Sequence, residues 1–383
     1  DAQQRLAEAR TRQAAIEANE KKQQQLIQAQ TALNALGLYA GKADGVSRPE
    51  TRAAINRWLK ANDLATGTEL TEGLVARMRQ QAKAETTRRL MEAKAEKERK
   101  IAAVEAAEQK RLAERNKSLN ALRKAHKHAV AVIIGNRDYA GRTPDVAFAG
   151  NDADAVRRFV IDNLGYREGN IIDLRDATLT QLNATFGTTD NHKGQLFDYV
   201  RAGKSDVVVF YSGHGVPGLK DRQGYLLPVN ADPNRAELNG YSLDTLLANL
   251  AKVPARSMAV YLDACFSGNS AKGTLVRATS GITVQARMPN ASKQMVVVTA
   301  ARNDQFASWD EDAKHGLFTK HLLAALRGKA DGAGFGNGDG KVTLAELKSY
   351  LDEEMTYHAR RRWSRDQNAS IQGDLSTVLA TQQ

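Results

Sequence analysis

The chain has 383 residues, and because single hydrophobic cores stop growing at about 250 to 300 residues, this length predicts at least two structural units. The composition, 42% hydrophobic and 26% charged, excludes a membrane-embedded protein, a collagen and a wholly disordered chain. A formal net charge of +11 suggests at first a polyanionic partner such as nucleic acid, a cell-wall polymer or an anionic membrane surface.

The positive charge is concentrated in one segment. Residues 78–128 carry 15 basic and 7 acidic side chains, whereas residues 129–383 carry 29 and 28. The segment lacks Gly and Pro and is rich in Ala, Glu, Lys, Arg and Gln, which predicts a long exposed helix. Because the two signs are interleaved, we favour a solvated connector over a nucleic-acid arm and expect no nucleic-acid partner.

The number of cysteines and the identity of the first residue give information on the cellular compartment of the protein. Cys265 is the only cysteine, so an intrachain disulfide is excluded and the redox compartment stays open. No apolar run approaches the roughly 20 residues of a membrane span, and we expect no transmembrane segment. The first residue is Asp1 and not Met, which is typical of a trimmed chain and favours a periplasmic or secreted location over a cytoplasmic one.

The N-terminal 77 residues divide into two predicted parts. Residues 1–30 are rich in Gln and Ala and are predicted to be helical. Residues 31–77 are predicted to form three short helices, at 31–38, 51–61 and 71–79, with a glycine-containing loop after the first.

The wording of the second part, TALNALGLYAGKADGVSRPETRAAINRWLKANDL, resembles the peptidoglycan-binding-like three-helix module. The resemblance implies peptidoglycan as a partner, although Ser47 and Arg48 replace the usual Phe-Gly. A helical spacer that keeps the scaffold without the ligand is the alternative. The residues that match the pattern are Asp44, Gly45, Thr51, Arg52, Ala54 and Ile55.

From residue 129 the pattern changes to alternating strands and helices, which predicts an α/β domain over 129–383. Continuous apolar runs are typical of parallel strands buried on both faces, so we expect a mainly parallel sheet with helices on both faces. In such sheets the functional site forms at the carboxyl ends of the strands. The first helix is predicted to begin with Asn151 or Asp152 as its N-cap. The predicted strands are 129–135, 170–174, 206–212, 257–264 and 294–301.

Two of these strands end in residues that carry chemistry. The strand DVVVFYS leads directly into Gly213-His214-Gly215, and SMAVYLDA leads directly into Cys265. A thiol needs a nearby imidazole to become an effective nucleophile, and neighbouring parallel strands would bring the two side chains together. The His precedes the Cys by 51 residues, close to the spacing of about 50 in caspases.

The motifs YSGHG and YLDACFSG resemble the caspase-like cysteine peptidases, and among them the bacterial and metacaspase-like branch. The resemblance covers residues 129–383 and implies a caspase-like fold and a cysteine endopeptidase. It implies that Cys265 is the nucleophile, that His214 is the general acid and base, and that the backbone N–H groups of Gly215 and Cys265 form the oxyanion hole.

The resemblance also implies a specificity. Asp152, Asp263 and Ser212 match the acidic pocket of relatives that cut after Arg or Lys, whereas caspases that cut after Asp need cationic pockets. Two converging carboxylates bind a guanidinium through charge-assisted, bidentate hydrogen bonds. We therefore predict cleavage after Arg, then Lys. The alternatives are a plain helix N-cap for Asp152 and a strand-end pairing for Asp263.

A glycine-rich stretch near the C-terminus, ADGAGFGNGDGKVTLAELKSYL, is a weak calcium candidate. With Glu346 at position 12 of an EF-hand loop, Asn337 and Asp339 fall on ligating positions, but Phe335 at position 1 cannot ligate. Asp331 substitutes only if the loop is longer. The alternative, which we favour, is a turn that caps the next helix, so no cofactor is expected to be required and Ca²⁺ is the one candidate.

Two hypotheses follow from the sequence. The first is a Cys-His endopeptidase that also cuts itself, in the basic segment 78–128 or in the loop that holds Lys272, Arg277 and Arg287. Its partner is a protein or peptide substrate with Arg or Lys before the cut. The second is a catalytically silent caspase-like scaffold whose N-terminal module binds cell wall or a protein partner. His315 and His321, which flank a predicted helix, are interpreted as surface or packing residues.

Overall fold

The computed structural model describes residues 2–270, 273–276, 285–302 and 304–382. By its internal contacts the chain divides into two compact units, Asp1–Arg111 and Leu112–Gln383. Among the described residues, no helix is long and apolar enough to cross a membrane.

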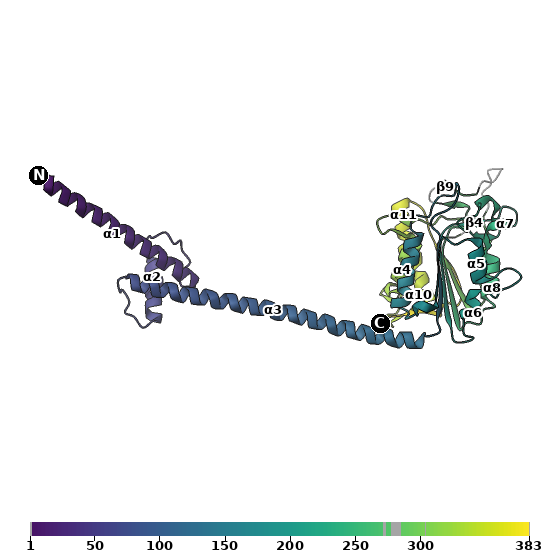
Figure 1. The fold of residues 1–383 in the computed structure, drawn as a ribbon, viewed down its shortest axis with the longest axis horizontal. Helices are drawn as coiled ribbons and strands as arrows, with labels where there is room; N and C mark the ends of the chain where they lie inside the picture. Colours follow the sequence, from purple (N-terminus) through teal and green to yellow (C-terminus); the bar gives the residue numbers. More distant parts are fainter. Residues whose placement is uncertain (1, 271–272, 277–284, 303, 383) are drawn as a thin grey trace. The chain divides into compact units, whose positions relative to one another are not determined.

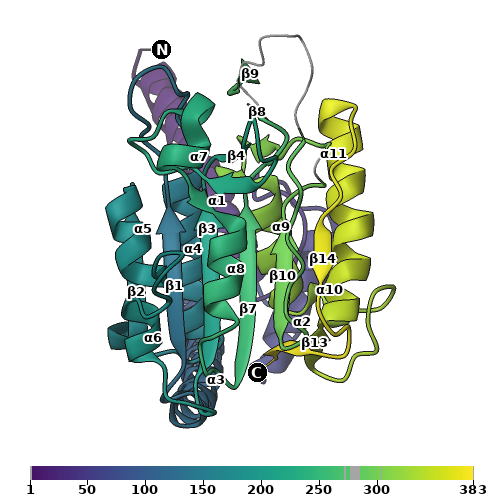
Figure 2. The same ribbon diagram turned by 90° about the vertical axis from the view of Figure 1, so that its right-hand side faces the viewer.

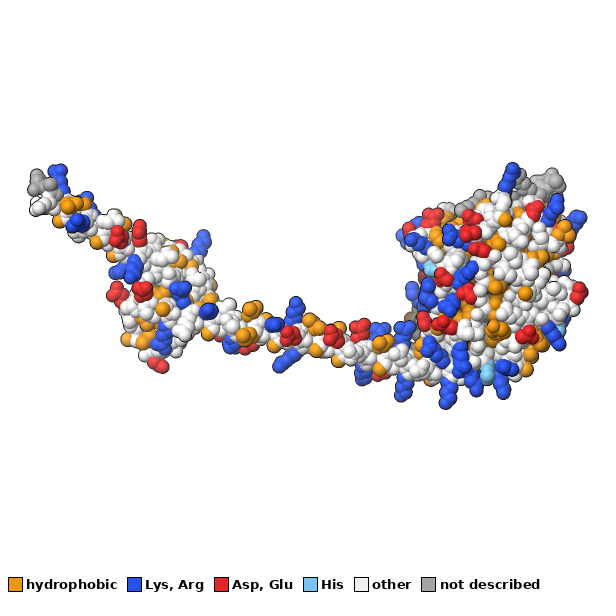
Figure 3. Space-filling model, in the orientation of Figure 1, with side chains coloured by type: hydrophobic (Ala, Val, Ile, Leu, Met, Phe, Trp, Pro, Cys, Tyr) orange, Lys and Arg blue, Asp and Glu red, His pale blue; other side chains and the backbone are white. Residues whose placement is uncertain are grey.

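The N-terminal unit is built on long helices. Its elements are α1 (Ala2–Ala35), α2 (Pro49–Ala61) and α3 (Glu72–Ala125), and α3 continues into the second unit. The prediction of separate helices at 1–30 and 31–38 was wrong, because no residue that breaks a helix stands between them. The third short helix and the basic segment likewise form one helix. Along α3 the Lys and Arg side chains are interleaved with Glu side chains (Figure 3).

A small apolar core joins the three helices of this unit. Trp58 and Leu59 of α2 are buried against Leu33 of α1 and Val75 and Met78 of α3. Outside this core α1 and α3 are exposed, as expected for helices with few apolar residues.

The second unit contains a six-stranded sheet in the order β14-β10-β7-β3-β1-β2. The strands lie side by side in this order in Figure 2, and only β14 is antiparallel to its neighbour. The predicted mainly parallel sheet is therefore confirmed. The strands are β1 (Val130–Gly135), β2 (Ile171–Arg175), β3 (Asp206–Ser212), β7 (Ser257–Asp263), β10 (Met295–Thr299) and β14 (Ser370–Gln372).

Helices cover both faces of this sheet, as predicted (Figure 1). Alternate residues of each strand enter two different cores, which explains the continuous apolar runs. One face carries α4 (Ala149–Asp162), α9 (Leu317–Leu326), α10 (Leu344–Tyr350) and α11 (Thr356–Trp363). The other carries α5 (Leu179–Phe186), α6 (Gln195–Tyr199) and α8 (Leu243–Leu250).

Short strands form the loops around the sheet. At its carboxyl edge, β4 (Gly215–Pro217) pairs with β5 (Gly224–Leu226), which pairs with β6 (Tyr241–Ser242). Before α9, β11 (Trp309–Asp310) pairs with β12 (His315–Gly316). The remaining elements are α7 (Ala236–Asn239), β8 (Asn269–Ser270), β9 (Gly273–Thr274), β13 (Lys341–Thr343) and β15 (Val378–Thr381).

The start of α4 differs from the prediction. Its N-cap is Phe148, so Asn151 and Asp152 lie inside the first turn and neither is the cap. The prediction of a polar cap was wrong because the backbone N–H of Asp152 already bonds to the Phe148 carbonyl at 2.9 Å. The Asp152 side chain is therefore available to residues outside its own helix.

Candidate active site

The two motif strands are neighbours, and they end in register. Ser212, the last residue of β3, pairs with Asp263, the last residue of β7. His214 and Cys265 each follow two residues later, so both emerge from the same edge of the sheet. The backbone N–H of Gly213 bonds to the Asp263 carbonyl at 3.2 Å, which extends the contact between the strands beyond their ends.

The His214 imidazole is buried and held in one orientation. Its Nε2 lies 2.6 Å from the carbonyl oxygen of Pro144, and since a carbonyl only accepts, Nε2 carries the proton. The neutral ring then has Nδ1 as its proton-accepting nitrogen. The Tyr139 ring lies 4.6 Å away, centroid to centroid, and its hydroxyl accepts the backbone N–H of His214 at 2.8 Å.

The Cys265 thiol lies two residues beyond the end of β7 and packs against the core on the α4 and α9 face of the sheet. The backbone N–H of Ala307 donates to its Sγ at 2.5 Å. Burial raises the pKa of the Cys265 thiol to about 12, and the nearby Asp263 carboxylate also raises it. At neutral pH the sulfur is therefore protonated, and its proton must be removed as it reacts.

Gly215 lies directly against the cysteine segment. A Cβ at this position would stand 2.9 Å from the Cys265 carbonyl oxygen and 2.6 Å from a ring carbon of Phe266. Only glycine allows this approach, so close packing requires a glycine at position 215, directly after His214. The backbone at Gly215 therefore lies directly beside the backbone at Cys265.

The three candidate specificity residues also converge. The Ser212 hydroxyl donates to Asp152 Oδ2 at 3.1 Å, and the backbone N–H of Gly316 lies 3.1 and 3.2 Å from the two Asp152 oxygens. His315 Nδ1 lies 2.8 Å from Asp152 Oδ1. Burial raises the pKa of Asp152, and the contact with His315 opposes that shift.

Asp263 completes a pair of buried carboxylates. Its Oδ2 accepts the hydroxyl and the backbone N–H of Thr319 at 2.6 and 3.2 Å. Burial, followed by the negative charge of Asp152, raises the pKa of Asp263 to about 7. Gly316 lies between the two acids, because a Cβ there would be 2.2 Å from Asp263 Oδ2 and 3.0 Å from Asp152 Oδ2.

Comparison with known families decides the class of this domain. A family model described as the caspase domain matches residues 128–372, which is more than half of the chain. The chain belongs to the caspase-domain family. The caspase-domain family is one of cysteine peptidases, which are hydrolases, so the predicted resemblance is confirmed. A second family model, for a peptidoglycan binding domain, matches residues 22–73.

Solved structures that resemble this chain are distant. Caspase-1 from Spodoptera frugiperda has 14% identity and a TM-score of 0.42, over 67% of this chain and 91% of that one. A protein from Geobacter sulfurreducens has 16% identity and a TM-score of 0.44, over 67% of this chain and 99% of that one. No curated protein matches the chain.

Four contacts in the caspase domain were not predicted from the sequence. Pro144 and Ala307 act through backbone atoms, which no motif indicates. Thr319 and His315 act through side chains, and His315 was interpreted as a surface or packing residue. Its place in the sequence, two residues before the first residue of α9, gave no indication that the β11–β12 pair would bring it to Asp152.

The calcium candidates near the C-terminus bind backbone groups. Asp331 accepts the N–H groups of Asp339 and Gly340 at 3.1 and 2.9 Å, and Glu346 forms a capping box with Thr343 at the start of α10. Asn337 Oδ1 accepts the Asp339 N–H at 3.0 Å. Within the described ranges no cluster of three or more His, Cys, Asp or Glu side chains is arranged to hold a metal ion.

The N-terminal module departs from its family pattern at Arg48, and the structure shows what that residue does. Two guanidinium nitrogens of Arg48 donate to the two oxygens of Asp44 at 2.8 and 2.7 Å. These hydrogen bonds hold the pKa of Asp44 well below its usual range. The loop before α2 is therefore closed by an ion pair where the family pattern has Phe-Gly.

Proposed function

We propose that the chain is a cysteine endopeptidase in which Cys265 is the nucleophile and His214 the general acid and base. The observation that supports this most strongly is the pairing of Ser212 with Asp263, which brings both motifs to one edge of the sheet. The Pro144 contact supports the same assignment, since a proton on Nε2 leaves Nδ1 as the basic nitrogen of the neutral ring.

The reaction follows from this arrangement. As Sγ of Cys265 attacks the scissile carbonyl carbon, its proton passes to His214, and the oxyanion is stabilised by the N–H groups of Gly215 and Cys265. His214 then gives the proton to the leaving amine as the C–N bond breaks. Water hydrolyses the remaining thioester with His214 as base. Because the thiol is protonated at rest, attack and proton removal are coupled.

We further propose that Asp152 and Asp263 bind an Arg side chain before the cut, and Lys less well. Asp152 is 1% exposed and Asp263 7% exposed, and the imidazole of His315 lies against Asp152. Among the described residues, no group donates to Oδ1 of Asp263. A guanidinium would supply the missing positive charge and bridge the two acids, after displacing His315 from Asp152.

The experiment compares peptides that differ only in the residue before the cut. Arg, Lys, Gln and Asp peptides are incubated with wild type and with Cys265→Ala, and products are identified by mass spectrometry. We expect wild type to cut after Arg and, more weakly, after Lys. Cys265→Ala should cut none of the peptides. Cleavage after Asp alone would overturn the specificity, and equal cleavage by the variant would overturn the catalytic assignment.

Self-processing is proposed at two kinds of position. Lys272 and Arg277 lie outside the described residues, whereas Arg287 is exposed and its backbone N–H bonds to the Arg222 carbonyl at 2.7 Å. The basic residues of 78–128 are almost all helical, so cutting there requires local unwinding to an extended strand. Mass spectra of the intact chain over time would show the fragments. An uncut chain that still cuts peptides would contradict this proposal.

A binding role for the N-terminal module is a second candidate, supported by the family match over residues 22–73. An open groove beside the first loop is lined by Tyr39, Lys42, Arg48 and Arg57. Co-sedimentation of the Cys265→Ala chain with purified peptidoglycan would test it, with Lys42→Glu as the comparison. If the chain stays in the supernatant at low salt, the module is a spacer, and the peptidase proposal is unaffected.

A further inference from the structure

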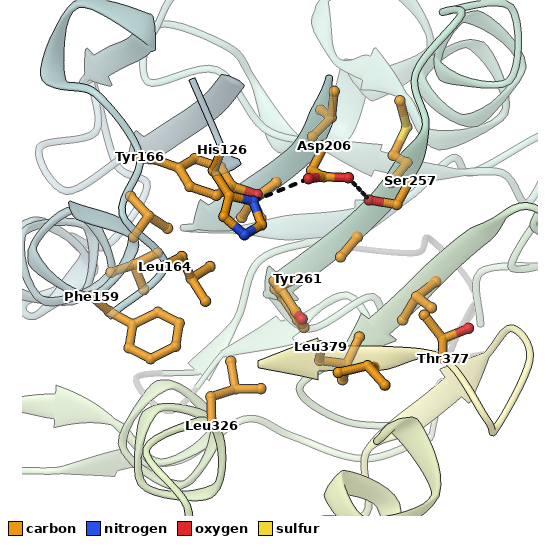
Figure 4. Close-up of a pocket in the computed structure, with 18 of the residues that line it drawn as sticks. His126, Phe159, Leu164, Tyr166, Asp206, Ser257, Tyr261, Leu326, Thr377 and Leu379 are labelled. Atoms are coloured by element: carbon orange, nitrogen blue, oxygen red, sulfur yellow. Dashed lines mark hydrogen bonds and ion pairs between the residues drawn. The ribbon is translucent and has the colours of Figure 1, made fainter. Parts of the chain in front are cut away.

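The caspase domain contains a cavity at the amino edge of its sheet, opposite to the candidate active site. Its volume is about 240 Å³. The walls come from the sheet and from α4, α9 and β15, and Figure 4 shows Tyr261 between His126 and Leu326 in this lining. Most of the lining is apolar and includes Phe159, Val160, Leu322, Leu326 and Leu379.

The cavity exists because the strands present short side chains to it. Val208, Ala259 and Val296 face the two helices from β3, β7 and β10. Among the described residues, Tyr261 of β7 is the one aromatic side chain that the sheet contributes to the lining. An engineered apolar cavity of about 150 Å³ binds benzene, so a space of this size suits a molecule with one substituted ring.

The charged group at the rim is already satisfied. Asp206 accepts Arg256 Nε at 2.8 Å and the Ser257 hydroxyl at 2.6 Å, and it lies 3.1 Å from His126 Nδ1. These contacts, together with a second Arg256 nitrogen, hold the pKa of Asp206 well below its usual range despite its burial. A charged ligand would find no free counter-charge there, so the cavity suits a neutral molecule.

Two polar atoms remain for a ligand. His126 Nδ1 lies against Asp206, so in the neutral ring Nε2 is the acceptor nitrogen, and Figure 4 shows that nitrogen turned toward the cavity. The Tyr261 hydroxyl has no hydrogen-bond partner among the described residues, although the side chain is only 4% exposed. A ligand group in the cavity would give this hydroxyl a hydrogen-bond partner.

We propose that this cavity is a binding site for a small neutral molecule with an apolar, ring-sized body and one hydroxyl group. A hydroxyl both donates and accepts, so it matches the imidazole acceptor of His126 and the phenol of Tyr261. The apolar walls bind the body of the molecule. The site is independent of the proposed peptidase reaction, since none of its residues takes part in that chemistry.

The test uses phenol and toluene, which differ by the replacement of a hydroxyl by a methyl group. Binding to the full chain carrying Cys265→Ala, which cannot cut itself, is measured by ligand-observed NMR and by the shift in melting temperature. A purely apolar cavity would prefer toluene, because phenol would lose its hydration. We expect phenol to bind at least as tightly as toluene. A preference for toluene, or no binding of either probe, would overturn the proposal.

Three variants locate the site. His126→Phe keeps an aromatic ring stacked on Tyr166, 6.1 Å away. It is expected to lower the affinity for phenol by about three- to tenfold and to leave the affinity for toluene unchanged. Tyr261→Phe removes a hydroxyl that has no partner in the described part of the chain, so it should fold normally and weaken only the binding of phenol. Ala259→Met fills the cavity and should abolish both, whereas Ala248→Met on the exposed side of α8 should not.

If Ala259→Met fails to fold, His126→Phe and Tyr261→Phe still test the proposal. Folding is checked by circular dichroism and by cooperative thermal unfolding. Phenol affinity unchanged in both His126→Phe and Tyr261→Phe would show that the hydroxyl is not bound where we place it.

Discussion

Carboxyl groups at the two edges of the central sheet have pKa values shifted in opposite directions. At the amino edge, Asp206 begins β3 and is surrounded by donors, among them the cation Arg256, so its pKa lies well below its usual range. At the carboxyl edge, Asp263 ends β7, is buried beside Asp152 and has Thr319 as its donor among the described residues, so its pKa rises to about 7.

The opposite pKa shifts indicate that Asp206 has a structural role and that Asp263 is a candidate for binding a ligand. A carboxylate that has its cation inside the fold stabilises the fold and offers little to a ligand. Two carboxylates that share few donors are costly to keep charged, and a cationic ligand repays part of that cost on binding. The comparison therefore supports Arg binding at the carboxyl edge and a purely structural role for Asp206.

The largest effect is expected from the proposed nucleophile. Cys265→Ala should lower kcat/KM by at least about 10⁴-fold, because the reaction has no other thiol to form the acyl intermediate. Initial rates with an Arg peptide measure it. Asp206→Asn is the matched control at the other edge and should stay within about threefold of wild type. Comparable losses in both variants would show that the edges do not differ as proposed.

Removing the charge of Asp263 should come next. Asp263→Asn is expected to lower kcat/KM for Arg peptides by about 100-fold, because it removes one charge from a bidentate contact. Cleavage of a Gln peptide should change far less. The same variant should unfold at a higher temperature at pH 8, since it no longer buries a charge beside Asp152. Equal losses for Arg and Gln peptides would assign Asp263 to the general fold of the site.

The pH dependence of specificity should follow the same carboxyl group. As pH falls through about 7, Asp263 becomes neutral and loses its attraction for a guanidinium. The ratio of kcat/KM for Arg over Gln peptides should therefore fall about tenfold per pH unit below that point, and titration of the catalytic pair cancels in this ratio. In Asp263→Asn the part of this pH dependence that comes from Asp263 should be lost, so the ratio should vary less with pH over the same range.

Stability should show the complementary trend. Between the ordinary value of 3.8 and about 7, the folded Asp263 keeps a proton that the unfolded chain has released. Its contribution to the free energy of unfolding therefore falls as pH rises through that window, and is constant above it. Urea unfolding of wild type and Asp263→Asn at several pH values isolates this contribution. A difference between the two that does not vary with pH would contradict the raised pKa.

The smallest effect on catalysis should come from Asp206→Ala. We expect it to lower the free energy of unfolding by about 2 kcal/mol, because Arg256 and Ser257 lose their shared acceptor at a half-buried site. The preference for Arg peptides should not change. Because the folded pKa of Asp206 is depressed, its stabilisation is present at neutral pH and is lost in acid. A change in the Arg-to-Gln ratio would mean that the two edges are coupled.

Much of the fold was predictable because it depends on local pattern. The apolar runs at 129–135 and 206–212 correspond to β1 and β3, and their alternate residues enter the two cores as parallel strands require. The placing of His214 and Cys265 after strand ends followed from the same pattern. Helix starts were predicted less well, since the N-cap of α4 is Phe148, a residue without a capping side chain.

The sequence by itself determined the class of the domain and the residues that carry its candidate chemistry. These are set by strand periodicity, by the residues that follow each strand, and by the motifs around His214 and Cys265. Only the tertiary structure decided what those residues contact. Pro144 lies 70 positions from His214, and His315 lies 163 positions from Asp152. Such partners come from loops and strand pairs whose positions depend on packing of the whole domain, which no local pattern records.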